Sequence, residues 1–383
     1  MAVMSRRARR PSPGIEIVDA DAPERDLGAW DDLTARAVEP HPHYSRHAVA
    51  AHRAAGLASK NLAFVTVRHG GRLAALLPFT LDLDIVGFGT PVARPFASPF
   101  VTSTAPLVAD GPDFARTLDT LVGALSEASG GRPWRWPLLS TERRTGAWMI
   151  AAMRAAGWQV ALVEAFERPV LDRRADHDAY LAEHPSKGRL KDLRRRRRRL
   201  GERGVLSLDT ATGGAPLRAA LDAFLRLEAA GWKGGAGTAL SSRPATEAFA
   251  RTLFTEGGGP VGVRADSLCL DGRPLAVSLA LLAGGTATLL KTAYDEAERA
   301  HAPGLVLEAE IVRALHETRF AERLDSATLA GSALESLYAE RETVAEIVAV
   351  PPGGSRLVGI ERRVRLARFE HRAKAEAKRW LRR

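Results

Sequence analysis

A carboxylate, a lysine and several glycines occur together between residues 228 and 240. Glu228 continues an apolar stripe with helical spacing, formed by Leu217, Leu221, Phe224 and Leu225. A carboxylate buried on such a stripe without a partner would hold its proton more tightly than a free glutamate, which suits acid–base chemistry. The glycine-rich loop that follows lets backbone N–H groups approach a ligand, and its candidate substrate-binding residues are Trp232, Lys233, Gly234 and Thr238. The alternative interpretation is an ordinary helix end followed by a flexible loop.

Two further polar residues, Tyr294 and Asp295, follow a predicted strand at residues 286–293. Ligands of α/β proteins gather at the C-terminal ends of strands. If an acyl group is transferred from a thioester, an acceptor amine can attack directly, and the enzyme supplies a base, donors for the carbonyl oxygen and an acid for the leaving thiolate. Tyr294 is the candidate acid, and Asp295 or Glu228 is the candidate base or the group that grips the amine. The alternative is a tyrosine that packs at a strand end and an aspartate that caps a turn.

Pro303 and Gly304 mark the start of a predicted helix at residues 303–317. A helix N-terminus attracts anions through its free N–H groups and its dipole. We therefore take Pro303, Gly304 and Leu305, with Lys291 on the preceding strand, as candidates to bind the anionic part of a donor.

These pieces resemble, in their order along the chain, the signature of a known family. The set comprises Glu228, Gly231-Trp232-Lys233-Gly234, Gly237-Thr238-Ala239, Tyr294-Asp295, Pro303-Gly304 and Asp325-Ser326. It is similar to the GNAT-superfamily acyltransferases of the CelD-like, cellulose-biosynthesis type, whose fold is similar to that of the FemAB peptidyltransferases. The resemblance is firm over residues 180–345 and looser over residues 14–172.

The resemblance implies an acyltransferase of two GNAT-like halves, with the chemistry concentrated in the second. It implies acetyl-CoA or another acyl-CoA as donor, no metal, and a small-molecule or saccharide acceptor in exopolysaccharide, cellulose or envelope metabolism. The usual GNAT loop, Gln/Arg-x-x-Gly-x-Gly/Ala, is absent at residues 302–305, where this chain has Ala-Pro-Gly-Leu. A FemAB-like transferase that uses aminoacyl-tRNA is therefore one alternative, and a non-catalytic scaffold that binds a polyanion is another.

The elements that must position these residues alternate between strands and helices, which is typical of an α/β protein. The first half is predicted to hold strands at 14–18, 61–69, 73–81, 134–139 and 158–166, and helices at 30–38, 114–125 and 145–156. The second half is predicted to hold strands at 205–209, 261–270, 275–282, 286–293 and 323–327, and helices at 183–201, 217–231, 244–255 and 303–317. The turn segments 71–75 and 272–276 echo each other between apolar strands, which supports a duplication. We expect an α/β (α+β) fold of two tandem GNAT-like domains with mixed, mostly antiparallel sheets flanked by helices.

A length of 383 residues is long for one core and natural for two domains. The predicted organisation is a disordered basic tail, an N-terminal GNAT-like domain, a C-terminal acyltransferase domain and a basic helix, at residues 1–13, 14–172, 173–350 and 351–383. The single cysteine, Cys269, excludes a disulfide framework and suggests a reducing compartment. No stretch has the roughly 18 apolar residues of a membrane span, and no apolar signal region follows the basic N-terminus. We therefore expect a cytoplasmic protein without a transmembrane segment.

The net charge of +10 is concentrated in a few segments. Residues 187–199 hold nine basic residues and one acidic residue, and residues 356–383 hold eleven and three. The remainder of the chain is acidic, so these segments, and not the overall charge, indicate possible partners. Six consecutive arginines, Arg194–Arg199, cover every side of a helix, so we expect it to have no apolar face and to be solvated or to contact a polyanion. The C-terminal basic helix is either solvated or lies on an anionic membrane surface.

Four histidines crowd one stretch, at His41, His43, His47 and His52. No carboxylate in that run suits a His-x-x-x-His metal site, and cysteine ligands are absent, so we expect packing or surface histidines and no metal. The chain also lacks a Gly-x-Ser-x-Gly elbow, a P-loop and a Rossmann fingerprint.

Overall fold

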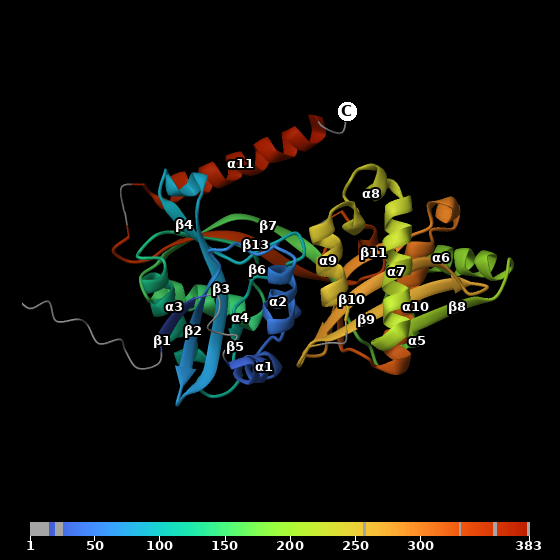
Figure 1. The fold of residues 1–383 in the computed structure, drawn as a ribbon, viewed down its shortest axis with the longest axis horizontal. Coiled ribbons are helices and arrows are strands. Elements are labelled where there is room, and N and C mark those ends of the chain that lie inside the picture. Colours follow the sequence, from blue (N-terminus) through green and yellow to red (C-terminus); the bar gives the residue numbers. More distant parts are fainter. Residues whose placement is uncertain (1–14, 20–25, 256–257, 329–330, 355–357, 381–383) are drawn as a thin grey trace, which may run out of the picture.

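The computed structural model describes residues 15–19, 26–255, 258–328, 331–354 and 358–380. Within these residues one mixed sheet of 13 strands runs through both halves, which lie side by side in Figure 1. The predicted fold class is confirmed, and the sheets of the two halves are joined into one. The predicted tail at residues 1–13 lies outside the described residues.

The strands follow the alternation of apolar residues along the chain. Those of the N-terminal half are β1 (Ile15–Asp19), β2 (Ala63–His69), β3 (Arg72–Leu83), β4 (Pro91–Pro95), β5 (Leu107–Val108), β6 (Trp134–Ser140) and β7 (Gln159–Asp172). Those of the C-terminal half are β8 (Leu206–Ala211), β9 (Gly262–Leu270), β10 (Arg273–Ala283), β11 (Thr286–Tyr294), β12 (Arg323–Asp325) and β13 (Glu340–Val350).

Two hairpins with left-handed turn residues explain the echo in the sequence. Gly70 and Gly71 join β2 to β3 with φ values of 56° and 82°, and Asp271 and Gly272 join β9 to β10 with 50° and 76°. Two consecutive positive φ values fit the twist of paired strands, and glycine adopts them without steric cost. Each half therefore carries the same hairpin at the same point of its sheet.

The two halves exchange their last strands. The sheet order is β1-β2-β3-β4-β6-β13-β7-β12-β11-β10-β9-β8, with β5 paired to β3 beside this path. In each half the fourth strand is parallel to its next neighbour, as β4 is to β6 and β11 is to β12. In the N-terminal half β6 then pairs with β13, whereas in the C-terminal half β12 pairs with β7. The arrangement is pseudo-symmetric, and the predicted domain ends at residues 172 and 350 coincide with the ends of the exchanged strands.

Helices cover the sheet of the N-terminal half around its own core. They are α1 (Leu27–Ala35), α2 (Arg46–Ala54), α3 (Phe114–Ala128) and α4 (Arg144–Ala155). The core is built around two buried tryptophans, Trp134 and Trp136, whose rings stack at 5.4 Å. The rings of Phe100, in the N-terminal half, and Phe249, in the C-terminal half, also stack, with their centroids 4.6 Å apart. Apolar side-chain contacts therefore join the two halves in addition to the strand pairing of the sheet.

The C-terminal half has a separate core on each face of its sheet. Its helices are α5 (His177–Glu183), α6 (Lys187–Gly201), α7 (Gly214–Ala230), α8 (Trp232–Gly235), α9 (Pro244–Leu253) and α10 (Pro303–Thr318). One core joins α7 and α9 to inward-facing residues such as Val263, and the other joins α5, α6 and α10 to residues such as Leu268. Because Val263 and Leu268 lie on one strand, β9, with opposite parity, they point to opposite faces.

The basic helix α6 corrects one prediction. We expected no apolar face, yet Leu190, Leu193 and Leu200 are buried and contribute to the core beneath α10. A helix needs only a narrow apolar stripe to dock, and the arginines occupy the remaining positions. The basic character of the segment therefore describes its outer surface and not the whole helix.

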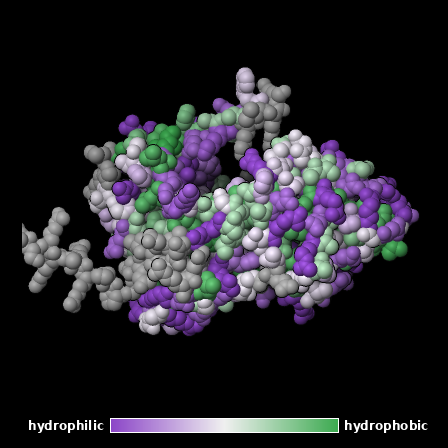
Figure 2. All heavy atoms as spheres, in the orientation of Figure 1, coloured by the Kyte–Doolittle hydropathy of each residue, from purple (hydrophilic) through white to green (hydrophobic). Residues whose placement is uncertain are grey.

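The C-terminal helix α11 (Ile360–Trp380) crosses the strands of the N-terminal half near β7 and extends beyond them (Figure 1). Val364 and Ala367 of α11 are buried against the exchanged strands, while Phe369 and Trp380 are exposed. Hydrophobic residues form scattered patches on the face shown in Figure 2. No helix of the described residues is long and apolar enough to cross a membrane.

Candidate functional site

Glu228, near the end of α7, is buried but is not isolated. Its Oε2 accepts a hydrogen bond of 2.7 Å from the N–H of Leu240, and its Oε1 lies 2.6 Å from Nζ of Lys291 and 3.4 Å from Nζ of Lys233. The side chain is 3% exposed. The sequence-based argument assumed a buried carboxylate without a partner, and the structure corrects that assumption. Ion pairing is what makes a buried carboxylate tolerable in this environment.

Two ammonium groups share this one carboxylate oxygen. Lys233 is largely buried and also donates a hydrogen bond of 3.3 Å to the carbonyl of Thr292. Burial lowers the pKa of Lys233, Glu228 raises it, and nearby Lys291 lowers it again. The cluster carries one negative and two positive charges when ionised, so it favours an anion or a developing negative charge at its open side.

The glycine-rich loop is held in place by specific contacts. The N–H of Trp232 donates a hydrogen bond of 2.8 Å to Glu296, while the indole of Trp232 is 62% exposed. A Cβ on Gly234 would lie 1.8 Å from the carbonyl oxygen of Ala229, so only glycine fits there. Gly234 thus lets the loop pack against α7. This favours the interpretation of an ordinary helix end and loop over a role of Gly234 in binding a ligand. Thr238 caps the loop with a 3.3 Å hydrogen bond to the carbonyl of Lys233.

Four of the predicted site residues line one small cavity at the C-terminal end of β11. They are Glu228, Trp232, Lys233 and Tyr294. The hydroxyl of Tyr294 makes no hydrogen bond to the described residues, so it is available to a ligand. The start of α10 adjoins the cavity, because a Cβ on Gly304 would lie 3.3 Å from the ring of Tyr294.

Asp295 has a structural task in this arrangement. Its Oδ1 accepts a hydrogen bond of 3.0 Å from the N–H of Ala297, and its Oδ2 pairs with Arg273 at 2.7 Å. It caps the 3-10 turn Glu296–His301 that leads into α10. Both of its oxygens are engaged, and Asp295 is not among the residues lining the cavity.

The edge of β11 opens beside this cavity. β11 pairs with β12 only from Thr286 to Thr288, so residues 289–294 have no partner on β12. The register against β10 shifts at the same place, because Leu279 pairs with Lys291 while Ala280 pairs with Leu289. The extra residue, Leu290, forms a bulge, and bulges release backbone groups from the ladder next to functional sites.

The N-terminus of α10 faces this opening. Pro303 is at the first helical position, and Ala302 before it has a φ of 49° and gives no side-chain cap. Pro303 has no N–H, and the N–H groups of Leu305 and Val306 donate to the carbonyl of Ala302 at 3.0 and 3.1 Å. Within the described residues, the N–H of Gly304 is therefore the first-turn donor that stays open to an anion. Arg196 of α6 donates a hydrogen bond of 2.6 Å to the carbonyl of Ala300, which places a guanidinium beside the same turn.

Comparison with known proteins identifies this part of the chain. Residues 187–330 match the sequence profile described as "Acetyltransferase (GNAT) domain". This likeness to an acetyltransferase domain covers that segment of the chain. No curated protein sequence matches the chain.

Solved structures share the fold over both halves. The chain is similar to the C-terminal domain of a putative lysylphosphatidylglycerol synthetase from Agrobacterium fabrum, with a TM-score of 0.54, 14% identity, and coverage of 91% of this chain and 96% of the other. It is also similar to FemX, with a TM-score of 0.53, 10% identity, and coverage of 85% and 96%. L-PGS from Bacillus licheniformis gives a TM-score of 0.51, 11% identity, and coverage of 92% and 98%. At these identities the likeness concerns the fold, and the CelD-like type stays a prediction.

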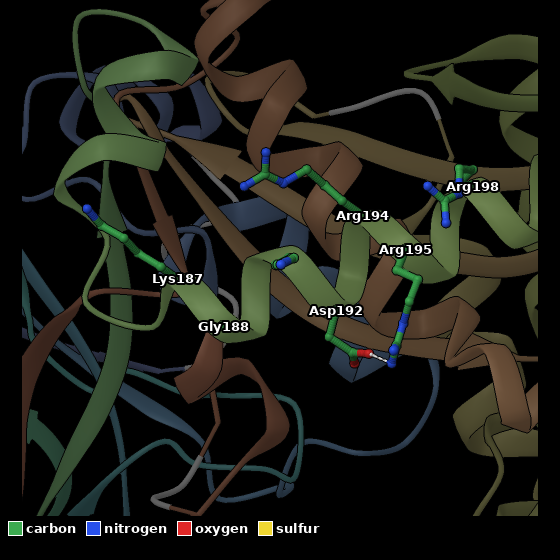
Figure 3. A pocket seen from close by; sticks show the side chains of 7 residues that line it. Lys187, Gly188, Asp192, Arg194, Arg195 and Arg198 are labelled. Carbon is green, nitrogen blue, oxygen red and sulfur yellow. Dashed lines mark hydrogen bonds and ion pairs between the residues drawn. The ribbon is translucent and has the colours of Figure 1, made fainter.

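The matched segment begins with α6, whose outer face forms a basic stripe. Lys187, Lys191, Arg194, Arg195 and Arg198 line an open trough with Gly188 and Asp192, and the labelled arginines extend away from the helix in Figure 3. Asp192 pairs with Arg195 at 2.6 Å and with Arg196 at 2.8 Å. Lys187, Lys191 and Arg194 have no acidic partner among the described residues.

Sequence reasoning missed a second buried carboxylate in the matched segment. Glu308 of α10 is 2% exposed, accepts a hydrogen bond from the hydroxyl of Tyr338, and lines a small cavity with the buried Arg264–Asp266 pair. Burial raises the pKa of Glu308 to about 7. A signal was present, because Glu308 lies beside the apolar positions Leu307 and Ile311 of its helix.

Proposed function

We propose that the chain is an acyltransferase whose reaction takes place at the end of β11 in the GNAT domain. The donor is an acyl-CoA, most simply acetyl-CoA, and the acceptor is an amine or hydroxyl of a small polar molecule or saccharide. The observation that carries the proposal is the convergence of Glu228, Lys233 and Tyr294 on one cavity that adjoins the start of α10. An anionic donor fits the unpartnered N–H of Gly304 at the start of that helix and the ammonium group of Lys233.

The acceptor nitrogen attacks the carbonyl carbon of the thioester in the proposed reaction. A C–N bond forms, the C–S bond breaks, the amine proton passes to Glu228, and the thiolate takes a proton from Tyr294. The lysine pair offers positive charge to the developing oxyanion. Asp295 acts as a cap that fixes the turn before α10, so we give it a positioning role.

The groups that hold the two substrates follow from the same geometry. Pro303, Gly304 and Leu305 bind the donor phosphates, and Lys291 contributes charge through its pairing with Glu228 at 2.6 Å. The exposed indole of Trp232 offers a flat apolar surface to the acceptor, and such surfaces commonly contact sugar or hydrocarbon faces. A role in exopolysaccharide or envelope metabolism in the cytoplasm is part of this proposal, as is the CelD-like type.

A screen of product formation tests the proposal. Purified full-length chain is incubated with acetyl-CoA and a panel of amines, amino sugars and polyols, while released thiol and acylated product are measured. We expect at least one acceptor to give equal amounts of both. Thiol release without any acylated acceptor across the panel would argue against transfer.

The basic stripe of α6 favours a second candidate, a transferase that takes its acyl group from aminoacyl-tRNA. Its outward cations recur at intervals of three or four residues, or about 5–6 Å along the helix, which suits a phosphodiester backbone. Binding of tRNA, acetyl-CoA and a longer acyl-CoA is measured in parallel at two salt concentrations. Tight, salt-dependent tRNA binding without acyl-CoA binding would select this candidate.

A further inference from the structure

A second polar cavity occupies the position in the N-terminal half that corresponds to the proposed acyl-transfer site. The proposed site lies between the segment after α7 and the end of β11. In the pseudo-symmetric sheet, α1 and β4 take the places of α7 and β11. A cavity lies between the segment after α1 and the segment after β4, and residues of β7, β11 and β12 close it from the other half. Each half therefore carries a polar cavity at the corresponding place.

His41 places a free hydrogen-bond acceptor in this cavity. Its Nε2 lies 2.8 Å from the carbonyl oxygen of Ala105, and a carbonyl only accepts, so Nε2 carries the proton. Burial lowers the pKa of His41 to about 4, which keeps the ring neutral near pH 7. Its Nδ1 is then an unprotonated acceptor, and this buried atom has no partner among the described residues.

Arg168 of β7 places a free donor in the same cavity. The side chain is 3% exposed. Its Nη2 donates to the carbonyl of Thr102 at 2.7 Å, and its Nη1 lies 3.5 Å from Asp325. Its Nε is buried and has no partner among the described residues. Leaving a buried charged group short of a hydrogen bond is costly, so a ligand acceptor at this point would recover that cost.

The ion pairs around the cavity include loose ones. Arg143 lies 3.6 Å from both Glu39 and Glu342, distances longer than direct hydrogen bonds. Glu342 is neutralised by Arg323 at 2.6 Å, so the carboxylates of Glu39 and Asp325 face the guanidiniums of Arg143 and Arg168, while the buried histidines are neutral. The lining therefore offers both carboxylate acceptors and guanidinium donors, which suits a ligand that carries an ammonium group beside an oxygen.

We propose that this cavity binds a small molecule in which a primary ammonium group neighbours an oxygen atom. The ammonium donates to Nδ1 of His41 and to the carboxylates of Glu39 and Asp325, and the oxygen accepts from Nε of Arg168. Amino sugars, amino alcohols and amino acids share this chemistry.

The site is separate from the proposed acyl-transfer site. Thr288, which lines the cavity, is six residues from Tyr294, or about 20 Å along β11. The proposal therefore stands whether or not the acyltransferase assignment holds. Because β11 and β12 belong to the other half, a bound ligand would also tie the two halves together.

Calorimetric titration of the full-length chain tests the proposal. The probes are ethanolamine, glucosamine and glycine, which carry both groups, with methylamine and ethylene glycol as controls that each lack one group. We expect at least one of the three probes to bind at least tenfold more tightly than both controls. The probe that binds most tightly identifies the source as an amino alcohol, an amino sugar or an amino acid. Equal binding of probes and controls would overturn the proposal.

Two variants localise the binding. Glu39→Gln removes a charge while keeping an oxygen for the N–H of Thr145, and we expect at least tenfold weaker binding. Glu202→Gln, at an exposed carboxylate after α6, is the matched control and should bind as the wild type does. Ser103→Leu narrows the cavity from a separate loop and should abolish binding without relying on Glu39. Circular dichroism confirms folding, and tight binding that survives in folded Ser103→Leu would overturn the assignment.

Discussion

Glu228 connects three parts of the candidate site through one buried carboxylate. One oxygen fixes the loop through Leu240, and the other pairs with Lys291 and with Lys233, which lines the cavity. Its position on an apolar stripe was visible in the sequence, but its partners were not, because they come from distant segments. The unoccupied hydroxyl of Tyr294 likewise depends on packing that no local pattern records.

Substitution of Glu228 and Tyr294 separates catalytic from structural roles. Glu228→Gln keeps the size and the bond to Leu240 but loses the charge, and Tyr294→Phe loses only the hydroxyl. We expect each to lower kcat by about a hundred- to ten-thousand-fold, as for loss of a general base or acid, with donor Kd little changed. Steady-state rates and equilibrium donor binding measure the two effects. Near-normal turnover in Glu228→Gln would reassign that carboxylate to stabilising the loop.

Glu308 should make stability fall as the pH rises. Burial raises its pKa from 4.5 to about 7, so between these values the unfolded chain has released the proton while the folded chain retains it. The stabilising contribution is fully present below pH 4.5 and is lost as the pH rises towards 7, by on the order of 2–3 kcal/mol. Glu308→Gln should remove this part of the pH dependence. Urea unfolding at pH 5 and pH 7 measures the free energy of unfolding of both proteins. An equal change in this free energy between the two pH values in both proteins would contradict the prediction.

At the scale of elements, α6 separates structural arginines from surface arginines. Arg197 pairs with Glu310 at 2.7 Å, and Glu310 is 6% exposed, whereas Arg195 and Arg198 lie on the outer stripe. Six identical residues thus have different tasks according to the helix face that they occupy. The helix and its charge were predicted from the sequence. The burial of its leucines was not, because it depends on packing against α10.

Replacement of individual arginines should expose this difference. Arg197→Gln leaves the buried Glu310 with only Arg313, so we expect a loss of about 1–2 kcal/mol in the free energy of unfolding. Arg195→Gln, the matched surface variant, should change it by less than about 0.5 kcal/mol. Denaturant unfolding of both variants measures the contrast. Equal losses would show that the pairing with Glu310 contributes nothing.

Most strands and helices were predictable because hydrophobic periodicity and turn residues are local signals. The hairpins at residues 70–71 and 271–272 and the helix that begins at Pro303 were found in this way. The strand β13 was not predicted, and neither was its place between β6 and β7, because the residue pattern of a strand does not indicate which other strands it pairs with. The bulge at Leu290 has no sequence signal for the same reason.

At the scale of the whole molecule, the exchanged strands make the halves dependent on each other. β13 lies between β6 and β7, so the N-terminal half alone would have a gap in the middle of its sheet. The buried Ile347 of β13 contributes to the main core of the first half, and Val348 packs in a smaller cluster with Val86 and Val163 of the first half and residues of α11. Unpaired strand edges and exposed apolar faces of this kind favour aggregation.

Expression of residues 14–172 alone tests this dependence. We expect a product that aggregates or unfolds without a cooperative transition, because β6 and β7 lack their common partner. The full-length chain under the same conditions is the control. Cooperative thermal unfolding of the isolated segment, followed by circular dichroism, would show that the exchange is not needed for folding.

The proposed function requires an anionic donor at the start of α10, and measuring acetyl-CoA binding tests this requirement most directly. Gly304→Val would add bulk against Tyr294 and beside the unpartnered N–H of residue 304, since a Cβ there already lies 3.3 Å from the Tyr294 ring. Gly123→Val, at an open position on α3, is the matched control. We expect calorimetry to detect acetyl-CoA binding to the wild type and to Gly123→Val, and binding at least tenfold weaker to Gly304→Val. Equal affinity in all three proteins would contradict it.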